Sequence, residues 1–201
     1  MKYRIAAIVI CCCGVLLGAN QNAFAQEPAK AAAEEKKAPV KIELAGGTLV
    51  LTAPAQWKQV QPRFPQMVQY EFNAPADAKG EAPVRITVMI SGGGLEGNLA
   101  RWYGQFTQPD GKATQDIAQI EDLKIEGQKV HLVSITGTYS GGMMGGGRPA
   151  PKKENYQLMS GIIETEKMGT YFITATGPID ECQKLADGFR EMLKGMQVKK
   201  P

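Results

Sequence analysis

Three glycines with the spacing G-x-G-x-x-G, namely Gly92, Gly94 and Gly97, are the first residues here whose pattern could serve chemistry. In dinucleotide-binding enzymes such glycines lie between a strand and a helix and let the backbone approach a pyrophosphate. Residues 84–90 alternate like a strand and residues 95–106 have helical spacing, so the local condition is met. A dinucleotide fold also needs parallel βαβ units, whereas further strands follow here. We therefore expect turn glycines, and we predict no nucleotide or other cofactor.

A second glycine-rich segment, residues 140–154, carries two adjacent methionines and several basic side chains. It joins two expected strands, and connections of this length are usually either functional or disordered. Thioethers bind Cu(I), but no further Met, His or Cys lies close by in the sequence to complete such a site. The side chains that we consider able to contact a partner protein are Met143, Met144, Arg148, Lys152 and Lys153. A mobile, solvated loop tip is the simpler interpretation, and the partner contact is the alternative.

Residues suited to catalysis are few. His131 is the only histidine, and it stands in a predicted strand in register with Val133 and Ile135. A satisfied histidine on a sheet face is the simpler interpretation, and one histidine excludes metal sites built from several imidazoles. Cys182 lies on the apolar stripe of the last predicted helix, which indicates a buried, unreactive thiol. The carboxylates show no pairing typical of acid–base catalysis, so we predict neither catalytic nor metal-ligating residues.

Strands must position most of these groups. Alternating apolar residues predict hairpins that turn at 46–47, 126–128 and 167–169, and further strands near 68–74 and 84–90. Strands that follow one another directly in sequence favour an antiparallel sheet, in contrast to the alternating strands and helices of a parallel one.

Helical spacing predicts two amphipathic helices that would cover this sheet. The first is expected over 95–106, and the second runs to Met196 from Asp180, its expected N-cap. So few helices must pack on the faces of the sheet. The predicted fold class is therefore α+β, an antiparallel sheet flanked by a few helices.

The N-terminal segment, residues 1–25, has the three parts of a secretory signal peptide. Lys2 and Arg4 precede an apolar run, and Ala23-Phe24-Ala25 supplies the small residues that signal peptidase requires. The apolar run of about 15 residues is shorter than the roughly 20 that span a bilayer. We predict export to the periplasm or beyond, with no membrane span after cleavage; a retained anchor is the alternative.

The composition changes twice after the leader. Residues 26–39 are mainly Ala, Glu, Lys and Pro and predict a flexible tether, which leaves residues 40–201 as a single domain. Cys182 is the only cysteine beyond the leader, so no internal disulfide is expected. The chain has 23 Lys and Arg against 20 Asp and Glu. Such a nearly neutral protein has no global field that would steer it to nucleic acid.

The sequence also resembles the PsbP-like family of exported α/β/α sandwiches. The resemblance is carried by "LTAPAQWKQV", by the passage at 84–106, by "KIEGQKVHLVSITGTY" and by "GTYFITATGPIDECQKLADGFREML", and it covers nearly all of 40–197. The stretches "RWYGQFTQPDG" and "GTYSGGMMGGGRPAP" are similar to secreted proteins of planctomycete-type bacteria. The resemblance implies a non-catalytic protein that acts in the assembly or docking of others. It carries over no catalytic residues, and the long basic loop departs from the family pattern.

From these observations we predict an exported, non-catalytic binding or assembly module of the cell envelope, with a protein partner. Two alternatives stay open. One is a secreted enzyme, such as a hydrolase that uses dispersed carboxylates. The other is a passive structural component of the envelope.

Overall fold

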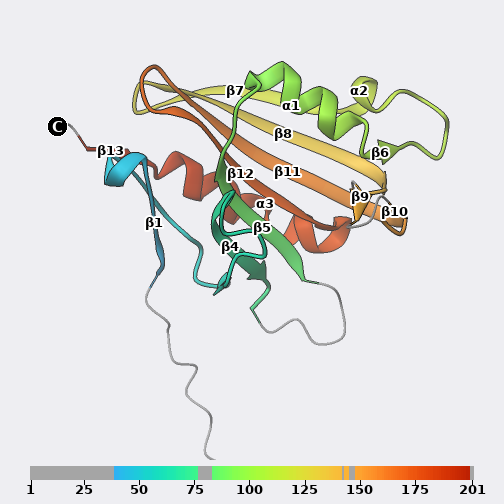
Figure 1. The fold of residues 1–201 in the computed structure, drawn as a ribbon, viewed down its shortest axis with the longest axis horizontal. Helices are drawn as coiled ribbons and strands as arrows, with labels where there is room; N and C mark the ends of the chain where they lie inside the picture. The colour runs from blue at the N-terminus through green and yellow to red at the C-terminus, as the bar shows by residue number, and fades with distance from the viewer. Residues whose placement is uncertain (1–38, 77–82, 142, 145–147, 200–201) are drawn as a thin grey trace, which may run out of the picture. The chain divides into compact units, whose positions relative to one another are not determined.

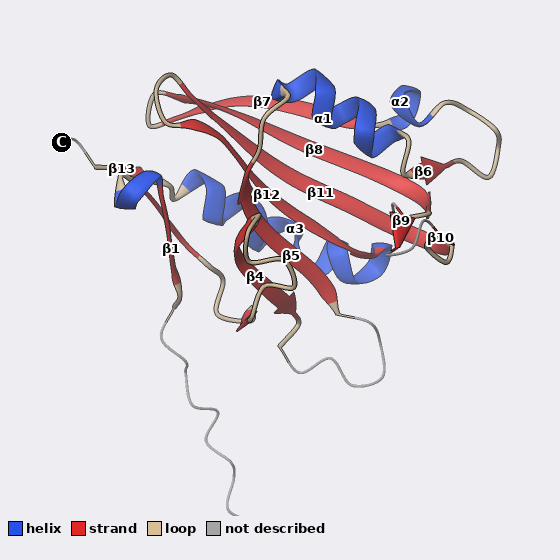
Figure 2. Cartoon of the chain, viewed as in Figure 1, coloured by secondary structure: helices blue, strands red, loops and turns tan. Residues whose placement is uncertain are grey.

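An antiparallel sheet of eight strands organises the computed structural model, which describes residues 39–76, 83–141, 143–144 and 148–199. These residues belong to one compact unit, and strands are its main component (Figure 2). The predicted leader, 1–25, and the predicted tether up to residue 38 lie outside the described residues.

The strands of the large sheet follow a spatial order that differs from their order in the sequence. They are β3 (Lys58–Val60), β4 (Val68–Ala74), β5 (Val84–Ile90), β12 (Gly169–Pro178), β11 (Lys153–Thr165), β8 (Gln128–Tyr139) and β6 (Phe106–Thr107), with β7 (Gln119–Ile125) also paired to β8. Every pairing is antiparallel. This confirms the predicted antiparallel sheet and the hairpins β7–β8 and β11–β12.

The remaining described strands form two smaller sheets. The first consists of β1 (Lys41–Leu44), β2 (Leu49–Thr52) and β13 (Gln197–Val198), and a 3-10 turn (Ala45–Gly47) joins β1 to β2. The second is a ribbon of β9 (Met143–Met144) and β10 (Arg148–Pro149) within the glycine-rich loop. This ribbon was not predicted from the sequence, because glycine is a poor strand former.

Three helices lie among the described residues: α1 (Gly94–Tyr103), α2 (Thr114–Ile117) and α3 (Ile179–Lys194). Both predicted helices exist, with shifted ends. Phe106 belongs to β6 and not to α1, and the N-cap of α3 is Pro178, which places Asp180 in the first helical turn. The expected N-cap was wrong, although an acidic side chain in the first turn still suits the helix dipole.

Adjacent residues along the central strands enter different hydrophobic clusters, because side chains of a strand point alternately to the two faces. Ile163 and Ile173 belong to a larger cluster with α3 and the small sheet, while Ile162 and Phe172 belong to a smaller cluster with α1. Figure 1 shows α3 passing behind the strands and α1 lying along β7 and β8. The α+β sandwich predicted from the sequence is confirmed.

The glycine motif lies where β5 leads into α1, and β5 and the next strand, β6, are separated in the sheet by β12, β11 and β8, so the motif does not belong to a βαβ unit of adjacent parallel strands. Strand β5 pairs with β4 and β12, and the chain then passes through α1 to β6, which pairs with β8. Gly93 and Gly94 have φ of 85° and 61°. Of the three motif glycines, only Gly94 has a positive φ, and Gly97 lies inside the helix. The turn interpretation therefore holds for Gly94 and its neighbour Gly93.

Two alanine substitutions in this motif should have opposite effects. Gly94→Ala should lower the free energy of unfolding by about 1–2 kcal/mol, because it forces a side chain into left-handed backbone. Gly97→Ala should raise it by up to about 1 kcal/mol, because alanine favours a helix and nothing lies within 4 Å of the added Cβ. Urea unfolding measures both. Micromolar binding of NAD to the unaltered protein, measured by calorimetry, would contradict the turn interpretation.

Candidate functional site

One face of the large sheet is only partly covered by a helix. Two adjoining hollows of about 520 and 330 Å³ lie on it, and they share Arg85, Tyr139 and Thr176. Because these residues line both hollows, we treat them as one groove, called here the basic groove. Strands β5, β11 and β12 supply its floor, α1 supplies one side, and the connection from β3 to β4 supplies another.

The charged side chains that line the basic groove all have the same sign among the described residues. They are Arg63, Arg85, Arg101 and Lys153. The four come from four different parts of the chain, namely the β3–β4 connection, β5, α1 and the start of β11. A hollow lined by charges of one sign focuses the field and attracts groups of the opposite charge. The groove is therefore suited to an anionic ligand.

A buried carboxylate holds the central cation of the groove in place. Arg85 donates from Nε and Nη2 to the two oxygens of Glu71, over 2.7 and 2.9 Å. The backbone N–H of Arg63 donates to the same carboxylate over 2.9 Å. The Glu71 side chain is only 1% exposed, whereas Arg85 keeps 34% of its side chain exposed. Glu71 thus fixes the guanidinium group of Arg85, while part of this side chain remains exposed to a ligand.

The surroundings of Glu71 keep it ionised. Burial raises the pKa of its carboxyl group, but the hydrogen bonds from Arg85 and from the Arg63 backbone, with the charges of both arginines, outweigh burial. The net result is a pKa below the ordinary value of 4.5. The Glu71–Arg85 pair is therefore charged at neutral pH. Arg63 Nε also lies 3.5 Å from Glu71 Oε1, so this one carboxylate faces two arginines, and the described lining residues of the groove include no other carboxylate.

Apolar and aromatic side chains border the charged floor. Met67 and Ile90 line the groove with 58% and 49% of their surface exposed. Tyr139 and Tyr156 stack with ring centroids 5.9 Å apart, and Lys153 Nζ lies 5.0 Å from the centroid of Tyr156. Exposed large apolar side chains beside fixed cations are typical of surfaces that bind other proteins.

Part of the predicted contact loop lies at one end of this groove. Lys153 lines the groove, and Lys152 precedes it as an exposed residue. Met143, Met144 and Arg148 lie in the ribbon of β9 and β10, and their side chains are outside the described part of the structure. The structure therefore brings one of the five predicted contact residues directly to the groove.

Sequence reasoning missed the other basic residues of the groove. Arg85 and Thr87 alternate with buried Val84, Ile86 and Val88 along β5, which showed that they share the polar side of a strand. The sequence does not show that Arg101 of α1 and Lys153 of β11 meet the same surface. That meeting depends on which strands become neighbours in the sheet, and periodicity does not reveal strand order.

Cys182 and His131 lie where the sequence placed them, but His131 is only partly satisfied, because its Nε2 has no hydrogen-bond partner among the described residues. His131 lies buried on the sheet, and its Nδ1 is 2.6 Å from Asp122 Oδ1 and its Nε2 is 3.5 Å from Glu164 Oε2. Cys182 is fully buried as a free thiol, and burial raises its pKa to about 12. A thiol with so high a pKa carries almost no thiolate at neutral pH and reacts slowly.

Within the described ranges, no group of three or more His, Cys, Asp or Glu side chains is placed to hold a metal ion. In the same part of the chain, no helix has the length and apolar character needed to cross a membrane.

Comparison with known proteins yields similar structures but no related sequences. Neither a family model nor a curated protein matches the chain. The solved structures to which it is similar include a PsbP of the cyanobacterium Synechocystis (CyanoP; 9% identity, TM-score 0.40, covering 80% of this chain and 92% of that one). They also include LpqN of Mycobacterium tuberculosis (11% identity, TM-score 0.46, 81% and 91% covered).

A PsbP structure is thus among those to which this chain is similar, in agreement with the resemblance seen in the sequence. LpqN is described as involved in cell envelope biogenesis. At these identities and scores the likeness concerns the arrangement of strands and helices alone, and no function follows from it.

Proposed function

We propose that this chain is an exported, non-catalytic binding module of the cell envelope that docks an acidic segment of a partner protein in the basic groove. The observation that carries the proposal is the single sign of charge in the groove, with Arg63, Arg85, Arg101 and Lys153 around one continuous hollow. Export is inferred from the leader at residues 1–25.

The apolar border of the groove favours a protein segment over a small inorganic anion. Met67 and Ile90 would gain little from a phosphate, whereas a peptide with alternating acidic and apolar side chains satisfies both kinds of surface. The connection between β3 and β4 also exposes Phe64, whose carbonyl oxygen accepts from the Met67 N–H over 3.0 Å. Apolar contacts would supply affinity there, and the charges would supply orientation and rate of association.

We include the loop at 140–154 in the proposed contact surface. Its basic residues Arg148, Lys152 and Lys153 extend the positive charge of the groove along the chain, and Met143 and Met144 offer flexible apolar side chains. Deleting residues 141–152 and closing the gap with a short turn should weaken binding. It should change the free energy of unfolding by no more than about 1 kcal/mol, because a shorter loop recovers closure entropy.

The test uses a defined peptide with alternating Glu and Leu, labelled for fluorescence anisotropy. The protein with Arg101→Glu and Lys153→Glu should bind this peptide at least about tenfold more weakly than the unaltered protein, which corresponds to about 1.4 kcal/mol. Affinity for the unaltered protein should fall as the salt concentration rises, because charge attraction is screened.

The matched control places the same charge change outside the groove. Lys124→Glu with Lys129→Glu alters two exposed lysines that face each other across the β7–β8 hairpin. This control should bind within twofold of the unaltered protein. Equal weakening in both double variants, or equal binding of a peptide with Lys in place of Glu, would show that the groove is not the docking site.

A further inference from the structure

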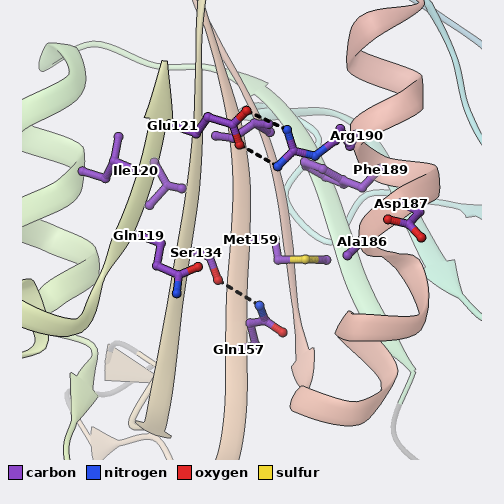
Figure 3. A pocket seen from close by; sticks show the side chains of 12 residues that line it. Gln119, Ile120, Glu121, Ser134, Gln157, Met159, Ala186, Asp187, Phe189 and Arg190 are labelled. Carbon is purple, nitrogen blue, oxygen red and sulfur yellow. Dashed lines mark hydrogen bonds and ion pairs between the residues drawn. The ribbon is translucent and has the colours of Figure 1, made fainter. Parts of the chain in front are cut away.

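A separate pocket lies on the opposite face of the sheet, between α3 and the strands β7, β8 and β11 (Figure 3). Its volume is about 400 Å³, which falls in the range of small-molecule sites. It is called here the α3 pocket. The polar floor of the pocket consists of Ser134 and Gln157, and its walls include Glu121, Met159, Ala186, Asp187, Phe189 and Arg190.

The packing of α3 explains why a pocket forms here. Leu193 of α3 lies so close to Gly161 of β11 that a Cβ on the glycine would come within 2.5 Å of it. The helix is thus held against β11, whereas toward β7 long side chains bridge the gap. Arg190 donates two hydrogen bonds to Glu121 over 2.8 and 2.6 Å, and Figure 3 shows this pair spanning from strand to helix.

The floor of the α3 pocket contains a buried polar atom without a partner. Gln157 is only 8% exposed. Its Nε2 donates to Ser134 Oγ over 2.9 Å, but its Oε1 has no hydrogen-bond partner in the described structure. Figure 3 shows the amide nitrogen toward Ser134 and the oxygen on the side toward α3. A buried acceptor left unpaired is unfavourable by roughly 1–3 kcal/mol, so a donor from a ligand would be stabilised there.

Exchanging the positions of the oxygen and nitrogen of the Gln157 amide would still leave one of these two atoms without a hydrogen-bond partner. The Ser134 hydroxyl can donate as well as accept, so the oxygen would then be paired and the nitrogen would be left alone. One polar atom of the amide therefore stays unsatisfied in either orientation, and it faces the same pocket.

The other walls limit the kind of molecule that fits. Met159, Phe189 and Ala186 present apolar surface, and the thioether of Met159 adapts to different shapes. Glu121 is paired with Arg190, and Asp187 adds a second carboxylate to the lining, so the described lining residues offer no unpaired cation to hold an anion. The pocket is therefore suited to a mainly apolar molecule that carries no negative charge.

We propose that the α3 pocket binds a small, mainly apolar molecule whose single N–H or O–H group donates to Gln157 Oε1. This site lies on the opposite face from the basic groove, and it is independent of the proposed docking function.

Indole and 1-methylindole form a matched pair of probes. They have nearly the same shape, but only indole has an N–H donor. We expect indole to bind with a dissociation constant of about 1 mM, and 1-methylindole at least fivefold more weakly. Titration of ¹⁵N-labelled protein followed by NMR measures both constants. The largest shifts should fall on the Gln157 side-chain amide and on the backbone of Ser134 and Ala186.

Substitutions separate this proposal from nonspecific binding. Gln157→Leu should bind the two probes equally, because it removes the acceptor, while the control Gln197→Leu on exposed β13 should keep the fivefold preference. Ala186→Phe should fill the pocket and weaken the binding of both probes at least tenfold. If Gln157→Leu fails to fold, this variant tests whether the probes bind in the α3 pocket. Three results would overturn the proposal. The unaltered protein could bind both probes equally, or it could show no saturable binding up to 10 mM, about ten times the expected constant. The third such result is a set of chemical shift changes that map to the basic groove.

Discussion

Glu71→Gln should lower the free energy of unfolding by about 3 kcal/mol, because it breaks a buried ion pair and leaves Arg85 without its counter-charge. Glu71 accepts two hydrogen bonds from Arg85 and one from the Arg63 backbone, and its side chain is almost wholly buried. The amide that replaces the carboxylate accepts fewer bonds and directs N–H groups toward a cation. Urea unfolding at pH 7 measures the loss.

The same substitution should change how stability depends on pH. The folded-state pKa of Glu71 is lower than the ordinary 4.5, so the unfolded state binds protons more readily. Its stabilising contribution is therefore fully present above the ordinary pKa and is lost as the pH falls through the folded-state value. The unaltered protein should lose stability below about pH 4.5 more steeply than Glu71→Gln. The pKa values of Asp110 and Glu121 are also lowered, so the free energy of unfolding should still depend on pH to some extent in both proteins.

Glu166→Gln is the control for charge alone, since Glu166 is exposed in the turn between β11 and β12. It should leave both the free energy of unfolding and its pH dependence within about 0.5 kcal/mol of the unaltered protein. If Glu71→Gln were equally harmless, the buried pair would not stabilise the strands β4 and β5, and Arg85 would not be held as described.

Gly161→Val should be similarly damaging, with a loss of about 3 kcal/mol, because no space exists between β11 and α3 at this point. An added Cβ would lie 2.5 and 2.8 Å from the two methyl groups of Leu193, and Leu193 is buried. Overpacking a core of this density forces side chains or the helix itself to shift. The backbone of Gly161 does not have a positive φ, so the expected loss comes from packing.

A double-mutant cycle separates this contact from a general effect of valine. Leu193→Ala removes the methyl groups that valine would meet, so Gly161→Val should be at least about 1.5 kcal/mol less damaging in that background. Equal losses in both backgrounds would contradict the close approach of α3 to β11. Thermal or urea unfolding of the four proteins supplies all the values required.

Much of the fold could be predicted because the local patterns are strong. The alternation of Val84, Ile86 and Val88 marks a strand whatever its neighbours are, and Glu126-Gly127 marks the β7–β8 turn through two residues with positive φ. Other features depend on tertiary contacts. Val68 breaks the expected alternation of β4 through a register shift before Tyr70, and Ile90 continues an apolar pattern yet is exposed beside the groove.

The candidate sites were harder to predict than the fold for one physical reason. The basic groove requires Arg101 of α1, Arg85 of β5 and Lys153 of β11 to lie around one hollow, and that follows from the pairing of β5 with β12 and of β12 with β11. The α3 pocket depends on an unpaired oxygen of Gln157, a residue that the sequence shows only as a polar position in a strand. The most conspicuous motif in the sequence, the three glycines, marks a turn and lies in neither candidate site.

The last strand, β13, joins the two ends of the described unit. It pairs with β2, and the Lys199 N–H donates to Thr48 O over 2.8 Å. The larger core cluster likewise contains residues from Ile42 to Met196. The chain therefore cannot complete this core until the segment that contains β13 has been synthesised, because contacts so distant in sequence form late. If residues 1–25 direct export, as we propose, this delay keeps the core open until β13 has been made, and an open chain is the form that passes through a narrow translocation channel.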